Sequence, residues 1–280
     1  MSCLSPDKIA QKAVALAVSK TKFSFDKMMV LSSLGGVYIA FGGFMMTTVT
    51  MDAAMFVGVG LSKLAGGIVF ATGLTLIVVA GGELFTGNCL MPIAFFCGQT
   101  RMSTIVKNWI LVYFCNMAGC ILCAALVYQS GLASGPCGGY AIRIAASKVS
   151  LAFGQAFFRG ILCNWLVVLA VWMSYGAEST VEKYVCCLIP VAAFVSMGFE
   201  HSIANMYFIT LGILAKTDAF ALANAAVNND VLSNLDIVGY ISNLIPVTLG
   251  NIVGGALFVA LPYFVSYRAA LRDGIAEGGR

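Results

Sequence analysis

Two short polar stretches inside long apolar segments decide the fold: GELFTGN at residues 82–88 and GFEHSIAN at residues 198–205. The first interrupts the apolar segment 64–100 and the second interrupts 184–215, and each segment is otherwise uncharged. At about 1.5 Å per residue, either segment as one straight helix would far exceed the roughly 30 Å of membrane hydrocarbon. Read as two crossings, each segment would have a connection of only one or two residues, too short to turn the chain.

We therefore expect each segment to be one crossing with its helix broken near mid-membrane. Gly81, Gly82 and Gly198 lie at the interruptions and provide the backbone freedom that a break requires. Non-helical backbone at this depth is tolerated only where protein buries it or where it lines a water-accessible cavity. The breaks thus indicate a pore or a binding site.

The composition excludes an ordinary soluble fold, because 60% of the 280 residues are hydrophobic and only 10% are charged. The net charge of +4 does not indicate nucleic-acid binding, since no basic cluster is accompanied by polar or aromatic base readers. Ten cysteines lack paired metal-ligand spacing, and the chain has one histidine. Eight of the cysteines lie in apolar runs, with Cys3 and Cys137 outside or at the edges, so we expect packing roles, no metal and no cofactor.

The two broken segments and the remaining uncharged runs predict an all-α integral membrane protein with six crossings, the second and fifth of them broken. The runs are 28–51, 64–82, 84–100, 108–142, 160–177, 184–199, 202–215 and 237–267. Six crossings place both termini on one side, and that side collects eleven of the sixteen Lys and Arg residues, which predicts cytoplasmic termini in the plasma (cell inner) membrane. The other side holds Lys63, Arg143, Lys148, Arg159 and Lys216.

Three ranges follow from this topology: 1–27 as an N-terminal amphipathic helix on the cytoplasmic surface, 28–267 as the channel domain, and 268–280 as a cytoplasmic tail. Ser5 and Pro6 predict a helix start. Ile9, Ala13, Leu16 and Ala17 then share one side of that helix. The charged residues of this range leave no apolar run typical of a cleaved signal.

The two halves of the chain resemble each other. Beyond the two polar stretches, Asn-x-x-Gly recurs at Asn116 in the third crossing and at Asn251 in the sixth. Because each half has an odd number of crossings, the second copy must insert upside down. We therefore expect two inverted three-helix repeats whose broken helices meet near the midplane.

Ionisable residues inside a membrane are costly and are functional candidates, and three qualify: Glu83, Glu200 and His201. His201 is favoured as a pore residue, although a neutral histidine satisfied by backbone at a break is the alternative. For the two glutamates a structural role is favoured, holding the breaks by accepting from exposed backbone N–H groups. Asn88 and Asn205 close the two motifs and are assigned to the same role.

An anion crossing at this depth needs donors and positive helix ends. Thr86 and Asn164 offer side-chain donors, while His201 offers a hydrogen bond or a proton. A weak-acid anion that gains a proton becomes neutral and passes an apolar constriction more easily.

The chain resembles the formate/nitrite transporter family in the stretches 82–88 and 198–206, and also in Lys148 and the stretches 160–165 and 244–251. The resemblance implies an aquaporin-like protomer in a homopentamer, in contact with the lipid bilayer, that passes formate, nitrite, hydrosulfide or similar anions. It implies a polar centre of Thr86, Asn164 and His201, and an outer vestibule with Lys148. The apolar constrictions that it implies are Phe70, Leu74, Leu84, Val167 and Phe194.

The best-supported function is a channel or transporter for small monovalent anions, with formate first and nitrite or hydrosulfide as alternatives. Arg159 and the context of Cys163, Asn164 and Trp165 leave the preferred anion open, and channel versus proton-coupled transport is open as well. A water or polyol channel is disfavoured because the two asparagines are not followed by Pro-Ala, and an ammonium channel because only one histidine is present. A membrane-embedded enzyme would need a metal cluster or a nucleophile with its base, which the chain does not supply.

Overall fold

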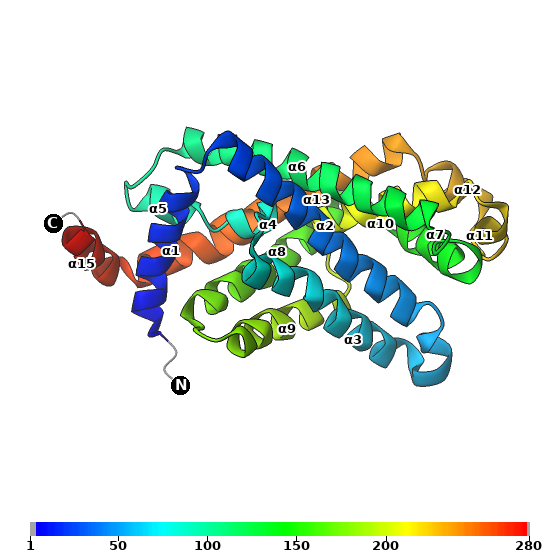
Figure 1. Ribbon diagram of the computed structural model, residues 1–280, viewed down its shortest axis with the longest axis horizontal. Coiled ribbons are helices and arrows are strands. Elements are labelled where there is room, and N and C mark those ends of the chain that lie inside the picture. The colour runs from blue at the N-terminus through cyan, green and yellow to red at the C-terminus, as the bar shows by residue number, and fades with distance from the viewer. Residues whose placement is uncertain (1–3, 279–280) are drawn as a thin grey trace.

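The computed structural model describes residues 4–278, with side chains through Gly274, and its described part contains helices and no strand. Cys3 and Arg280, which entered the cysteine and charge analysis, lie outside the described residues. The helices form an elongated bundle (Figure 1). Their bounds are α1 Pro6–Lys20, α2 Phe25–Thr50, α3 Ala53–Leu76, α4 Phe85–Asn88, α5 Pro92–Phe96, α6 Met102–Gln129, α7 Gly135–Val149, α8 Phe153–Gly176, α9 Thr180–Ser196, α10 Ser202–Ala215, α11 Ala219–Ala223, α12 Asn229–Ser233, α13 Ile237–Gly255, α14 Leu261–Ser266 and α15 Arg268–Gly278.

Five helical segments of the described chain are long and apolar enough to cross a membrane: Phe25–Thr50, Ala53–Gly81, Met102–Gln129, Phe153–Gly176 and Ile237–Ser266. The second continues α3 through the π-helical turn Ile77–Gly81, and the fifth joins α13 and α14 through the π-helical turn Ala256–Ala260. Two shorter apolar helical segments, Phe85–Phe96 and Ser202–Ala215, follow the expected breaks. Large apolar side chains such as Phe56, Phe114 and Ile189 are exposed on the outside, as expected of helices that face lipid.

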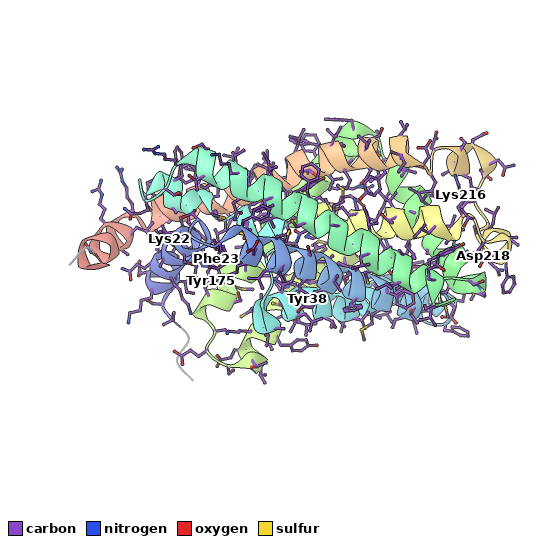
Figure 2. The ribbon with its side chains drawn as sticks, turned by 45° about the horizontal axis from the view of Figure 1, so that its top comes forward. Lys22, Phe23, Tyr38, Tyr175, Lys216 and Asp218 are labelled. Carbon is purple, nitrogen blue, oxygen red and sulfur yellow. The ribbon has the colours of Figure 1, made fainter. Side chains whose placement is uncertain are left out.

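The helix nearest each described terminus lies at the same end of the bundle, because α1 contacts α15 (Figure 1). The Gln11 side chain donates to the carbonyl of Ala270, 2.8 Å away. Helices α7, α11 and α12 lie at the opposite end (Figure 1). Figure 2 likewise places Lys22 and Tyr175 at one end and Lys216 and Asp218 at the other. The ends of the bundle are therefore built from different connecting helices.

Helix α1 begins at Pro6 as the sequence predicts, and its apolar side packs on α5, α8 and α15. Ile9, Ala13 and Ala17 are buried there, while Leu16 is half-buried. The uncharged run 108–142, read from sequence as a single span, instead contains most of α6, a turn with Gly131 at φ 78°, and the first half of α7. A glycine with positive φ ends the helix where hydropathy alone shows no boundary.

Small residues allow the long helices to pack backbone against backbone. A Cβ placed on Gly36 of α2 would lie 2.1 Å from the carbonyl oxygen of Asn116 on α6. A Cβ on Gly254 of α13 would lie 2.3 Å from the carbonyl oxygen of Ile161 on α8. These approaches bring the asparagine of each Asn-x-x-Gly motif against the neighbouring helix, as small residues do at interfaces between membrane helices.

Candidate functional site

Both expected breaks are present. The helical segment of α3 ends at Gly81, whose φ is 94°, and α4 begins at Phe85. Helix α9 ends at Ser196, Gly198 has a φ of 73°, and α10 begins at Ser202. A φ in this region is strained for any residue with a Cβ, which explains a glycine at each break.

Thr86 and His201 join the two breaks. The Thr86 hydroxyl oxygen lies 2.8 Å from His201 Nε2, and both residues are buried. His201 is also the N-cap of α10, because its Nδ1 accepts the backbone N–H of Ala204 at 3.0 Å. A nitrogen that accepts carries no proton, so in the neutral ring the proton is on Nε2 and is donated to Thr86. The hydroxyl hydrogen of Thr86 is then free to donate to another acceptor.

Asn164 on α8 lies beside this pair. Its Nδ2 donates to the carbonyl of Thr86 at 3.2 Å and to the carbonyl of Asn251 at 2.6 Å. Its Oδ1 is buried and, among the described residues, has no hydrogen-bond partner, and the same holds for the hydroxyl of Ser202. Buried polar atoms in this state are normally satisfied by water or by a ligand. The structure thus brings Thr86, Asn164 and His201 together.

Two asparagines fasten the breaks to neighbouring helices. Asn116 Oδ1 accepts the N–H of Phe85 at 3.0 Å, and its Nδ2 donates to the carbonyls of Ser32 and Glu83 at 2.6 and 2.8 Å. Asn116 therefore links α2 to backbone groups in the first break and at the start of α4.

Asn251 makes the matching contacts in the other half of the chain. Its Oδ1 accepts the N–H of Ser202 at 2.9 Å, and its Nδ2 donates to the carbonyls of Gly160 and Glu200 at 2.8 and 3.0 Å.

Each buried glutamate pairs with a lysine and an asparagine. Glu83 Oε2 lies 3.0 Å from Lys20 Nζ and accepts from Asn88 Nδ2 at 2.8 Å. Asn88 Nδ2 also donates to Asn108 Oδ1 at 3.0 Å. Burial lowers the pKa of Lys20 on the surface helix α1, but the facing Glu83 carboxylate more than offsets this, so the pKa is raised.

The second glutamate has the same surroundings. Glu200 Oε2 lies 3.1 Å from Lys148 Nζ and accepts from Asn205 Nδ2 at 2.6 Å. Asn205 Nδ2 also donates to Asn243 Oδ1 at 2.8 Å. The expectation that the glutamates accept backbone N–H groups is therefore corrected: their carboxylates bind side chains, and Asn116 and Asn251 accept the backbone groups.

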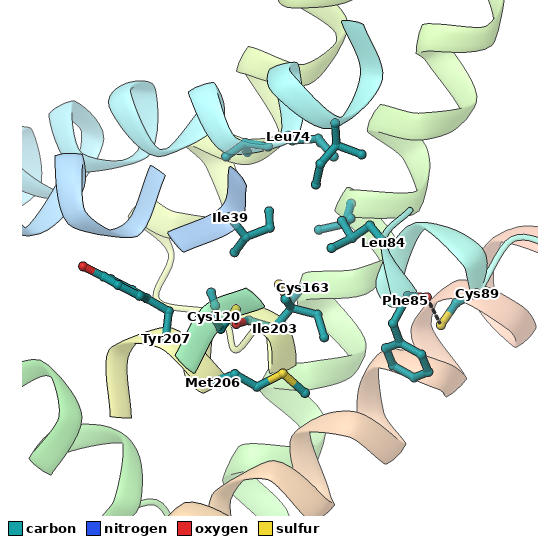
Figure 3. Packing of buried hydrophobic residues seen from close by; sticks show 14 of the residues in the cluster. Ile39, Leu74, Leu84, Phe85, Cys89, Cys120, Cys163, Ile203, Met206 and Tyr207 are labelled. Atoms are coloured by element: carbon teal, nitrogen blue, oxygen red, sulfur yellow. Dashed lines mark hydrogen bonds between the residues drawn. The ribbon is translucent and has the colours of Figure 1, made fainter. Parts of the chain in front are cut away.

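The apolar residues named from sequence lie close to this polar cluster and are buried. The rings of Phe70 and Phe194 contact edge to face with centroids 6.1 Å apart, and the ring of Phe194 stacks on His201 at 6.0 Å. Val167 is buried on α8. Leu74 and Leu84 come from the two sides of the first break (Figure 3).

A cavity of about 430 Å³ opens between α1, the first break and α8. Leu74 and Leu84 lie in its wall together with Glu83 and Asn88. Its lysines are Lys12, Lys20, Lys27 and Lys183. A cavity wall with four lysines and one carboxylate, which pairs with Lys20, suits a small anion rather than a cation. In the described chain, no group of three or more His, Cys, Asp or Glu side chains is placed to hold a metal ion.

Sequence reasoning missed Lys20, Asn108 and Asn243 as partners of the break residues. The signal was available for Lys20: it precedes Phe25, the first residue of α2, by the same interval that separates Lys148 from Phe153, the first residue of α8. Extending the internal comparison to the surface helices α1 and α7 would have found it. The two asparagines recur as well: Asn108 lies eight residues before Asn116, and Asn243 lies eight residues before Asn251. Extending the Asn-x-x-Gly comparison along these helices would have found them too.

Comparison with known proteins agrees with this geometry. A family model described as Formate/nitrite transporter matches residues 7–265. A probable formate transporter of Methanothermobacter thermautotrophicus is 39% identical over 281 residues, 94% of this chain and 97% of the relative. The formate channel FocA of Escherichia coli (strain K12) is 39% identical over 272 residues, 94% of each chain.

Solved structures agree as well. A pentameric formate channel with formate bound matches with a TM-score of 0.77 at 37% identity, covering 87% of this chain and 97% of that chain. A structure named FNT family ion channel matches with a TM-score of 0.79 at 27% identity, covering 92% of this chain and 98% of that chain.

The apolar helices, their paired breaks and the buried polar cluster define a multi-pass membrane transport protein. The chain belongs to the formate/nitrite transporter family. The family assignment drawn from the two polar stretches is thereby confirmed.

Proposed function

We propose that this chain is a channel for small monovalent anions, with formate as the main substrate. The names of the relatives, which include a probable formate transporter and a formate channel, support formate ahead of nitrite or hydrosulfide. A transport role rather than an enzymatic one follows from the family.

The proposed architecture has six crossings arranged as two inverted three-helix repeats, in the aquaporin-like manner. The second crossing runs from α3 to α5 and the fifth from α9 to α10. Support comes from the matching hydrogen bonds of Asn116 and Asn251, which hold equivalent backbone groups in the two halves. Both termini are proposed to face the cytoplasm from the cell inner membrane, because most basic residues belong to that side.

The observation that carries the proposal is the 2.8 Å contact between Thr86 and His201. It links the two helix starts, whose N–H groups and positive dipole ends favour an anion. The free hydroxyl hydrogen of Thr86 would bind the anion, Asn164 would hold the short helix α4 that carries Thr86, and His201 would support the hydroxyl or supply a proton. Proton transfer from Nε2 to a weak-acid anion removes the charge of the anion before the apolar passage, and the ring takes the replacement proton from water that enters through the aqueous cavity.

The neighbouring residues take the roles that the family resemblance implies. Phe70, Leu74, Leu84, Val167 and Phe194 form the two apolar constrictions, and their burial close to the polar cluster supports this assignment. Lys148 belongs to the outer vestibule. A homopentamer is proposed because a structural relative is a pentameric formate channel.

Flux measurements on vesicles containing the purified protein test the proposal. Formate, nitrite, hydrosulfide and chloride are offered at several pH values, and vesicles without protein serve as the control. We expect formate to enter fastest and chloride slowest, with a rate that depends on pH. Formate entry no faster than in the protein-free vesicles contradicts the proposal, while nitrite or hydrosulfide entry without formate entry favours the alternative substrates.

A further inference from the structure

The two halves of the chain match residue by residue around the breaks. The N–H of Glu83 donates to the carbonyl of Leu31 at 3.0 Å, and the N–H of Glu200 donates to the carbonyl of Arg159 at 3.3 Å. Helices α2 and α8, which carry these carbonyls, begin at Phe25 and Phe153, so Leu31 and Arg159 have the same position in their helices. Arg159 is therefore the counterpart of Leu31.

Leu31 lies in the wall of the 430 Å³ cavity that leads to the first break. The counterpart position on α8 contacts the second break through the carbonyl of Arg159, and α7, whose Lys148 pairs with Glu200 in that break, lies at the opposite end of the bundle (Figure 1). Arg159 is exposed, and neither of the two ion pairs in the described part of the chain includes it. An arginine at the depth of a helix break is costly unless it faces water or a partner, which places its side chain toward the aqueous mouth.

Lys148 does not provide the free positive charge of that mouth. Its ammonium lies 3.2 and 3.1 Å from the two carboxylate oxygens of Glu200, and its side chain is only 13% exposed. The pair has no net charge, so it adds little long-range attraction for an anion. Arg159, by contrast, is exposed and takes part in neither ion pair of the described residues, and its carbonyl accepts the N–H of Glu200 in the second break.

We infer that Arg159 is the residue that captures the anion at the mouth opposite α1, and that it favours planar oxyanions such as formate or nitrite over hydrosulfide. The inference rests on the proposed function and names its substrate class at this mouth. A guanidinium presents a planar fork of N–H donors that matches two oxygens of one anion, whereas hydrosulfide offers a single atom.

The mouth at the α1 end and the mouth at the α7 end then differ in the position of the exposed basic side chain along the helix. At the inner cavity the base on α2 is Lys27, one helical turn before Leu31. On α8 the position matching Lys27 is Gln155, and the base is Arg159, one turn nearer the break. An anion that enters at the α7 end and binds Arg159 is thus held about 6 Å nearer the break than one that binds Lys27 at the α1 end, given a rise of about 1.5 Å per residue.

The test compares the concentration dependence of formate entry from each side, in right-side-out and inside-out membrane vesicles at low ionic strength. Arg159→Leu introduces the residue of the other half, Arg159→Lys keeps the charge without the fork, and Lys63→Leu is the matched control that removes an exposed base from α3. We expect Arg159→Leu to raise the KM for entry at the α7 end roughly three- to fivefold, the range of an exposed ion pair, and to leave entry at the α1 end unchanged. Arg159→Lys is expected to weaken formate and nitrite entry and to spare hydrosulfide.

The effect should shrink at high salt, where exposed charges are screened. Equal KM values for wild type and Arg159→Leu at the α7 end, or equal changes at both ends, overturn the inference while leaving formate transport in place. A change in oligomer size without a change in KM would show that Arg159 contacts a second copy instead, which also overturns it. Absence of formate entry in the wild type would instead reject the proposed function. If Arg159→Leu does not fold, Arg159→Gln gives the same comparison.

Discussion

His201 Nε2 lies 2.8 Å from the hydroxyl oxygen of Thr86, so one hydrogen bond joins two helix breaks that are 115 residues apart in the chain. The same histidine caps α10 through Nδ1. Its two nitrogens therefore have different partners, and replacing it affects both a helix start and the contact with Thr86. Variants that separate these two effects test the role of the ring.

His201→Asn should keep the cap and lose the contact with Thr86, because asparagine is a good N-cap but its short side chain does not reach as far as Nε2. We expect a folded protein with formate flux lowered roughly tenfold, as follows from losing about 1.4 kcal/mol in the passage. His201→Phe keeps the bulk and removes both bonds, and should also abolish the pH dependence of flux. Labelled formate uptake at several pH values measures both, with Thr217→Val, an exposed position beyond the far end of α10, as the control. Wild-type flux with an unchanged pH profile in His201→Phe contradicts a role for the ring.

Asn251→Ala should destabilise the fold strongly. It removes one acceptor and two donor contacts and leaves the N–H of Ser202 and the carbonyls of Gly160 and Glu200 without that partner. Losing buried hydrogen bonds of this kind costs on the order of 2–4 kcal/mol. Thermal unfolding in detergent measures the change, and Asn229→Ala, at an exposed position of α12, is the control. A midpoint equal to that of the control would show that the break does not depend on Asn251.

The Lys148 and Glu200 pair should show strong coupling. Lys148→Met alone leaves a buried carboxylate without its cation and is expected to cost about 3–5 kcal/mol, whereas the double variant with Glu200→Gln should recover most of that loss. A double-mutant cycle of unfolding free energies measures the coupling. Additive losses would mean that the pair contributes nothing beyond its separate side chains.

Gly36→Ala should separate α2 from α6. The added Cβ would lie 2.1 Å from a backbone oxygen of Asn116, a contact that no side-chain rotation relieves. We expect a loss of about 1–3 kcal/mol, as for other overpacked sites, and lower formate flux, because Asn116 also holds the first break. Gly60→Ala is the matched control, since nothing lies within 4 Å of a Cβ there. Equal unfolding midpoints for the two variants would contradict this packing argument.

The sequence alone determined the family, the positions of both breaks and the residues that meet between them. Charge is so costly in hydrocarbon that Glu83, Glu200 and His201 stand out in apolar segments, and only glycine readily takes the positive φ seen at Gly81 and Gly198. Such signals are local, because they depend on a residue and its immediate neighbours. They need no knowledge of which helices touch.

Only the tertiary structure shows which side chains are hydrogen-bond or ion-pair partners of the break residues. Lys20 reaches Glu83 from a surface helix, and Asn108 and Asn243 reach the break asparagines from other helices. The sequence shows that these residues recur in the two halves, but an apolar helix carries no pattern that shows which side chain each of them reaches. The low dielectric of the interior makes each unpaired polar group costly, and only the packed bundle shows which long-range pairing removes that cost.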